Sequence, residues 1–177
     1  MKKKFNFDLP AQNLPVTNWR DFSNIIKQNI KYKLIPFRLY YKYRAYKYSK
    51  NTTPELNVIN LISDKKKVCL DIGANLGLFT YFMSRSSEKV FAFEPNPYPL
   101  EYLKYVIDRN VEIVPIALGN LDGTIKLRIP KNRKGWSSNG ASIKNIALNN
   151  GIEHQVTVRR IDSLKIENIG LIKIDVE

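Results

Sequence analysis

The sequence predicts an α/β fold built on a parallel sheet, and three observations carry this prediction. Short, almost continuous apolar runs at 68–72, 90–93 and 111–118 have the length and composition of buried parallel strands. Stretches with helical spacing separate these runs, at 77–84 and 98–108. A glycine-bearing turn follows the first run directly, which is typical of a strand that leads into a helix at a ligand site. We therefore expect a doubly wound, Rossmann-like domain.

The basic charge of the chain is concentrated in an N-terminal appendage, residues 1–50. The 177 residues carry a formal net charge of +13. Residues 1–50 hold 12 Lys and Arg against 2 Asp and Glu, whereas residues 51–177 hold 17 against 14. We therefore divide the chain into a basic, Tyr-rich appendage over 1–50 and a domain over 51–177.

The appendage is predicted to form two helices that Pro36 separates. The first follows a capping pattern at Asn18. The second places one set of mostly aromatic residues on a single face, namely Phe37, Tyr40, Tyr41, Ala45 and Tyr48. For residues 31–50 the favoured interpretation is a helical pair that packs its aromatic rings on the domain. Contact with an anionic membrane surface or a glycolipid-type substrate comes next, and nucleic acid last.

The sequence contains no pattern typical of export or of a membrane span. The basic start at Met1–Lys4 is not followed by an apolar segment, and no run of 18 apolar residues exists. The single cysteine, Cys69, lies in a predicted buried strand, so no disulfide can form within the chain. We expect a cytoplasmic protein.

The remaining elements follow from caps, breakers and apolar spacing. A helix is expected to begin at Pro54, with Leu56, Ile59, Leu61 and Ile62 on its apolar side. An extra strand is expected over 124–129, ending at Pro130, and then loop or short helix over 131–150. Further strands are expected over 156–160 and, buried, over 171–176. A doubly wound sheet normally continues after such a strand, so we expect a fragment whose sheet is incomplete on its C-terminal side.

The glycine turn after the first strand does not have the spacing that dinucleotides require. The three glycine positions of that pattern hold Gly73, Asn75 and Leu78 here, and no P-loop pattern exists. What remains is Asp71 at the strand end and glycines at 73 and 77. This arrangement suits S-adenosylmethionine (SAM), because an acid can attract its ammonium group and free backbone N–H groups at a helix start can bind its carboxylate. Glu94, at the end of the next strand, can hydrogen-bond both ribose hydroxyls.

Four separated motifs resemble, in order, those of the FkbM family of methyltransferases. They are Asp71–Thr80, Ala92–Pro97, Ala117–Gly119 with Asp122 and Gly123, and Lys173–Glu177. The family is similar in fold to class I SAM-dependent methyltransferases and is associated with O-methylation of hydroxyls on sugars, glycans and polyketide-type products. The resemblance implies cofactor-binding roles for Asp71, Gly73, Asn75, Gly77, Glu94 and Asn96, with Ala117 near the adenine. In the family the last motif continues beyond the point at which this chain ends.

Asp175 is the candidate catalytic residue. In the last predicted strand Lys173, Asp175 and Glu177 share one face, so Asp175 could serve as a base or orient the acceptor, or could form a structural pair with Lys173. His154 is interpreted as a surface residue, and Ser142 as a residue on the acceptor side. No His/Cys cluster suggests a metal site.

Three functional hypotheses follow. The first is a SAM-dependent O-methyltransferase that acts on a sugar or glycan hydroxyl. The second is an RNA methyltransferase that uses the basic N-terminus. However, the Asn96–Tyr98 segment lacks the second proline of the amino-methyltransferase signature and follows the wrong strand. The third is an inactive, truncated domain that only binds SAM.

Overall fold

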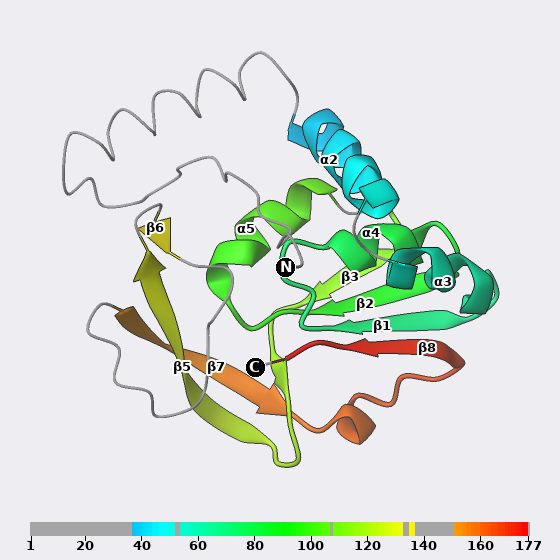
Figure 1. Ribbon diagram of the computed structural model, residues 1–177. Helices are drawn as coiled ribbons and strands as arrows, with labels where there is room; N and C mark the ends of the chain where they lie inside the picture. The colour runs from blue at the N-terminus through cyan, green and yellow to red at the C-terminus, as the bar shows by residue number, and fades with distance from the viewer. Residues whose placement is uncertain (1–36, 52–53, 107, 133–134, 137–150, 177) are drawn as a thin grey trace, which may run out of the picture.

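The computed structural model describes residues 37–51, 54–106, 108–132, 135–136 and 151–176, and its centre is a four-stranded parallel sheet (Figure 1). The strands are β1 (Val68–Ile72), β2 (Lys89–Phe93), β3 (Val111–Val114) and β8 (Ile169–Ile174), in the order β3-β2-β1-β8. All neighbours in this sheet pair in parallel. The predicted α/β, Rossmann-like fold is therefore confirmed.

A second sheet lies beside the first and has the order β4-β7-β5-β6. Its strands are β4 (Ala117–Leu118), β5 (Gly123–Asn132), β6 (Gly135–Trp136) and β7 (Gly151–Arg159). Strands β5 and β7 form a long antiparallel pair, and β4 joins β7 in parallel.

This second sheet corrects three predicted boundaries. The apolar run at 111–118 is two strands in different sheets, because the chain leaves β2 after Val114, and Pro115 cannot donate a ladder hydrogen bond. Strand β5 continues through Pro130, whose missing N–H does little harm because its pair with Gly151 is the last of the ladder to β7. Strand β7 begins five residues earlier than expected and includes His154.

Four helices cover one face of the parallel sheet. They are α2 (Phe37–Asn51), α3 (Pro54–Ile62), α4 (Leu78–Ser84) and α5 (Pro97–Val106). The main core lies between them and the sheet, and it contains Cys69 and Val90 from the strands and Met83 and Leu103 from the helices. On the opposite face Leu70, Ile72 and Phe93 pack against the segment that contains the 3-10 helix η1 (Ile161–Leu164).

The described part of the appendage packs on the domain. Tyr41 and Ala45 of α2 are completely buried in the main core, and the Tyr41 ring meets Tyr81 of α4 edge to face, with ring centroids 6.1 Å apart. Leu39, Tyr43 and Tyr46 of the same helix are exposed. The helix predicted from Asn18 and the acceptor-side Ser142 lie outside the described residues.

Two predicted apolar faces are more exposed than expected. In α3, Leu56 and Ile59 are buried but Leu61 and Ile62 are exposed, because the helix ends at Ile62 and its last turn passes the edge of the core. Strand β8 is not buried as predicted, since among the described strands it pairs only with β1 and forms an edge of the sheet. Ile172 and Ile174 are exposed there.

None of the described helices combines the length and the apolar character that crossing a membrane would require.

Candidate functional site

A pocket of about 530 Å³ lies where the carboxyl ends of β1 and β2 face the second sheet. Its volume is within the range of small-molecule sites. The turn after β1, the segment after β2, the connection from β4 to β5 and the residues after β8 all contribute to its lining. The lining residues are Gly73, Asn75, Phe93 to Asn96, Ile116 to Ile125, Leu127, Val156, Val158, Asp175 and Val176.

The turn after β1 requires glycine at position 73 for two independent reasons. Gly73 has a left-handed φ of 76°, which side chains rarely tolerate. A Cβ atom there would lie 2.1 Å from the carbonyl oxygen of Asp175. The turn is also fixed to β2, because the N–H groups of Gly73 and Ala74 both donate to the carbonyl oxygen of Phe93, at 3.0 and 2.9 Å. The turn, β2 and the chain after β8 therefore meet at one backbone position.

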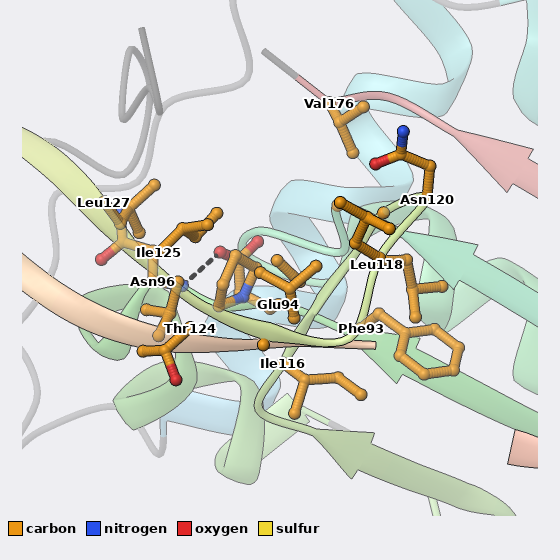
Figure 2. Close-up of a pocket in the computed structure, with 18 of the residues that line it drawn as sticks. Phe93, Glu94, Asn96, Ile116, Leu118, Asn120, Thr124, Ile125, Leu127 and Val176 are labelled. Atoms are coloured by element: carbon orange, nitrogen blue, oxygen red, sulfur yellow. Dashed lines mark hydrogen bonds between the residues drawn. The ribbon is translucent and has the colours of Figure 1, made fainter. Parts of the chain in front are cut away.

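Glu94 is a buried carboxylate at the pocket wall, 7% exposed. Its Oε2 accepts a hydrogen bond from the N–H of Asn75 at 2.7 Å. Its Oε1 accepts one from the N–H of Asn96 at 2.8 Å (Figure 2). Among the described residues no Lys or Arg forms an ion pair with Glu94. Burial raises the pKa of Glu94 to about 7, although the two N–H groups lower it in part.

Asp71 is also buried, but its surroundings are different. The Thr80 hydroxyl donates to its Oδ2 at 2.6 Å, and the Lys173 ammonium lies 3.0 Å from its Oδ1. Lys173 also donates to the carbonyl oxygen of Gly73 at 2.9 Å and lies 3.9 Å from Asp175. The expected partner of Lys173 was Asp175, whereas its closer partner is Asp71. The reason is the parallel register of β1 and β8, which places Asp71 opposite Lys173.

The structure brings six of the eight candidate site residues to the pocket. Asp71 and Gly77 are not among the lining residues: Asp71 lies on the helix-covered face of β1, and Gly77 precedes α4 with a left-handed φ of 78°. The six lining residues are Gly73, Asn75, Glu94, Asn96, Ala117 and Asp175.

Asn96 has a local structural task in addition to its place in the pocket. It is buried, and its side-chain oxygen accepts a hydrogen bond from the N–H of Tyr98 at 3.1 Å, in the first turn of α5. Its backbone N–H binds Glu94, so Asn96 connects the start of α5 to the pocket carboxylate.

The sequence did not point to the second sheet as a pocket wall. Ile125 and Leu127 of β5 line the pocket from this side (Figure 2). Val156 and Val158 of β7 belong to the same wall. The alternation of Ile125, Leu127 and Ile129 was the available signal, because it gives one strand an apolar face. Asp122 holds the turn before β5 against the end of β7, accepting a hydrogen bond from the N–H of Arg160 at 2.7 Å.

His154 is exposed on β7 and does not line the pocket, in agreement with its interpretation as a surface residue.

Comparisons with known proteins identify the family of this chain. The sequence model of the methyltransferase FkbM domain matches residues 71–177. No curated protein is significantly similar in sequence.

Several solved structures are similar in part. The FkbM methyltransferase from Methylobacillus flagellatus is 18% identical with a TM-score of 0.42, over 64% of this chain and 27% of that protein. A methyltransferase from Streptococcus mutans, solved in complex with SAH, is 20% identical with a TM-score of 0.32. The alignment covers 35% of this chain and 38% of that protein. An rRNA methylase from Streptococcus thermophilus is 19% identical with a TM-score of 0.32. The alignment covers 35% of this chain and 40% of that protein. The aligned part of this chain thus spans less than half the length of each of these proteins.

Proposed function

Because the chain belongs to the FkbM methyltransferase family, we propose that it transfers a methyl group from SAM to a hydroxyl group of a sugar, a glycan or a related natural product. SAM is the cofactor of this family. The observation that carries the proposal is the buried Glu94 carboxylate, which lines the pocket without an ion-pair partner among the described residues. The chemical identity of the acceptor rests on the family alone.

The lining of the pocket suits SAM. Each Glu94 oxygen accepts one backbone hydrogen bond, so each keeps a lone pair for a ribose hydroxyl. The apolar side chains of Ile116, Leu118 and Ile125 can cover an adenine ring. Gly73 and Asn75, from the turn before α4, complete the lining on the side where the amino-acid part of the cofactor would be held.

The protein has little covalent chemistry to perform in this reaction. Bound SAM supplies an electrophilic methyl group, and the acceptor oxygen must be held in line with it, which is worth on the order of 7–11 kcal/mol. We assign Asp175 to the acceptor side, where its carboxylate can accept the hydroxyl proton or orient the hydroxyl. Asp175 lines the pocket, and its side chain is 78% exposed.

Calorimetric titration with SAM and with its demethylated product tests the cofactor part of the proposal. The wild type should bind both. Glu94→Gln should weaken binding by about tenfold or more, because charged hydrogen bonds to the ribose are lost. Glu101→Gln removes an exposed carboxylate on α5 and is the matched control, with wild-type affinity expected. If the wild type binds neither compound, or if both variants bind equally well, the proposal fails.

The acceptor part needs a separate assay. Transfer of a labelled methyl group to sugar and glycan acceptors should depend on Asp175 and fall by about 10²–10⁴-fold in Asp175→Asn. RNA is the informative alternative substrate, since the appendage is strongly basic. Methylation of RNA but of no hydroxyl-bearing small molecule would replace the O-methyltransferase assignment.

A further inference from the structure

The Lys173 ammonium, to which the proposed methyl transfer gives no role, lies at the centre of a cluster of polar groups. It lies within 3.0 Å of two oxygens, Asp71 Oδ1 and the carbonyl of Gly73, and its side chain is only 15% exposed. Its third neighbour is the Asp175 carboxylate at 3.9 Å. The Phe79 ring of α4 shields it from a fourth direction, with its centroid 5.0 Å away.

We infer that Lys173 is a positioning residue for the turn after β1, and that Asp71 is the counterion of Lys173 and not a ligand of the cofactor. This inference rests on the proposed function, because it assigns the turn to the cofactor site. It departs from the sequence-based expectation that Asp71 attracts the ammonium group of SAM.

The first support is the immediate surroundings of the Asp71 carboxylate. Both oxygens have a short partner, since Thr80 donates to one and Lys173 neutralises the other. The side chain is completely buried, on the face of β1 that carries Cys69 and packs against the helices. A cation of the cofactor would have to displace Lys173 from this buried carboxylate and break an ion pair that the chain already provides.

The second support is the hydrogen bond from Lys173 to the carbonyl oxygen of Gly73. This carbonyl belongs to the left-handed residue with which the turn begins. The N–H groups of Gly73 and Ala74 are held by β2, so Lys173 supplies the contact from the opposite side, from β8. The turn is therefore clamped between the two strands that flank β1, and removing Lys173 frees one side of it.

The third support is the charge arrangement. Asp71 and Lys173 form a pair with no net charge, and they act on the pocket carboxylate Glu94 in opposite directions, since Asp71 raises its pKa and Lys173 lowers it. The carboxylates that do line the pocket are Glu94 and Asp175. Asp175 is close enough to Lys173 to replace Asp71 as its counterion when the charge of Asp71 is removed.

Two variants separate the roles of the pair. Asp71→Asn keeps an oxygen for Lys173 and leaves the Lys173 bond to Gly73 in place, so SAM affinity should stay within about threefold of the wild type. The double variant Asp71→Asn with Lys173→Met removes the bond to Gly73, and SAM affinity should fall about 10–100-fold, as for other residues that orient a site without touching the ligand. Lys173→Arg in the wild-type background should restore part of the affinity that Lys173→Met loses.

Amide hydrogen exchange of the protein without cofactor gives a second readout. The Gly73 and Ala74 amides should exchange faster in the double variant than in Asp71→Asn. Thr80→Val removes one hydrogen bond of Asp71 but none of the turn, so these amides should keep wild-type protection there. This readout stands even if the chain binds no SAM, so failure of the proposed function would not be mistaken for failure of this inference.

Two results would overturn the inference. If Asp71→Asn alone loses as much SAM affinity as the double variant, Asp71 is a cofactor ligand. If the double variant keeps wild-type affinity and wild-type exchange at Gly73 and Ala74, Lys173 only neutralises Asp71 and positions nothing.

Discussion

Strands β1 and β2 lie side by side, and each presents a buried carboxylate at its carboxyl end, but the two carboxylates have different surroundings. Asp71 has an ammonium group at 3.0 Å and a hydroxyl at 2.6 Å. Glu94 has two backbone N–H groups and, within the described part of the chain, no ion-pair partner. The first side chain lies among the helices, and the second lies on the pocket wall.

The difference shows which buried charge belongs to the fold and which is available to a ligand. Burying an ionised carboxylate is costly unless a cation or several hydrogen bonds compensate it. At Asp71 the chain supplies the cation itself. At Glu94 the compensation is incomplete, and its pKa of about 7 reflects this. A strongly perturbed carboxyl group at a pocket is a good marker of a functional site.

Breaking the pair at Asp71 should give the largest effect. Lys173→Met leaves a carboxylate without its cation at a completely buried position, so the free energy of unfolding should fall by about 3–5 kcal/mol in chemical denaturation. Lys89→Met is the matched control, because Lys89 and Glu112 form an exposed pair that should contribute about 1 kcal/mol or less. Equal losses in the two variants would mean that Asp71 is not stabilised by Lys173.

The turn between the two carboxylates should be the next most sensitive position. Gly73→Ala combines a left-handed backbone with a collision against the Asp175 carbonyl, so we expect a loss of about 2–4 kcal/mol in thermal or chemical unfolding. Gly123→Ala is the control, because its added Cβ would meet no atom within 4 Å and should change stability by about 0.5 kcal/mol or less. A Gly73→Ala protein as stable as the control would contradict the close approach of β8.

The pH dependence of Glu94 should give a smaller effect. Its pKa in the folded chain, about 7, is above the ordinary 4.5, so the folded state holds the proton more tightly than the unfolded state. The resulting stabilisation is fully present below about pH 4.5 and is lost as the pH rises through 7. It amounts to no more than about 3–4 kcal/mol.

This effect is measured as the difference between the wild type and Glu94→Gln in denaturant unfolding from pH 4.5 to 8. As the pH rises, the free energy of unfolding of the wild type should fall relative to that of Glu94→Gln. Bound SAM should reduce the shift, because ribose hydroxyls that donate to Glu94 favour its ionised form. A difference that does not change with pH would show that Glu94 keeps its ordinary pKa.

The parallel sheet and the turn could be predicted from the sequence, because the patterns that indicate them are local. Val68–Ile72 is apolar except for Asp71, and the glycines of the turn follow it directly. The ion-pair partner of Asp71 could not be predicted from the sequence. It depends on the register between β1 and β8, which are about 100 residues apart in the chain. Asp175, two residues from Lys173, was the nearest acid on the same strand face and was therefore the expected partner.

Two further differences also arise from long-range structure. The run at 111–118 looks like one strand because it is almost continuously apolar, and only the pairing of Ala117 with Val158 separates it into two. Leu171, Ile172, Ile174 and Val176 look buried because they are apolar, whereas their exposure depends on which strand lies beside them.

The position of Tyr41 has a consequence for where the domain begins. The family match starts at residue 71, yet Tyr41 and Ala45 belong to the same core as Cys69 and Met83. A protein shortened to the matched region would lose α2, α3 and the first three residues of β1, and with them Tyr41, Ala45, Leu56, Ile59 and Cys69 of the main core. The part of the chain that folds as a unit is therefore larger than the part that defines its family, and helix α2, although basic and rich in tyrosine, belongs to that unit.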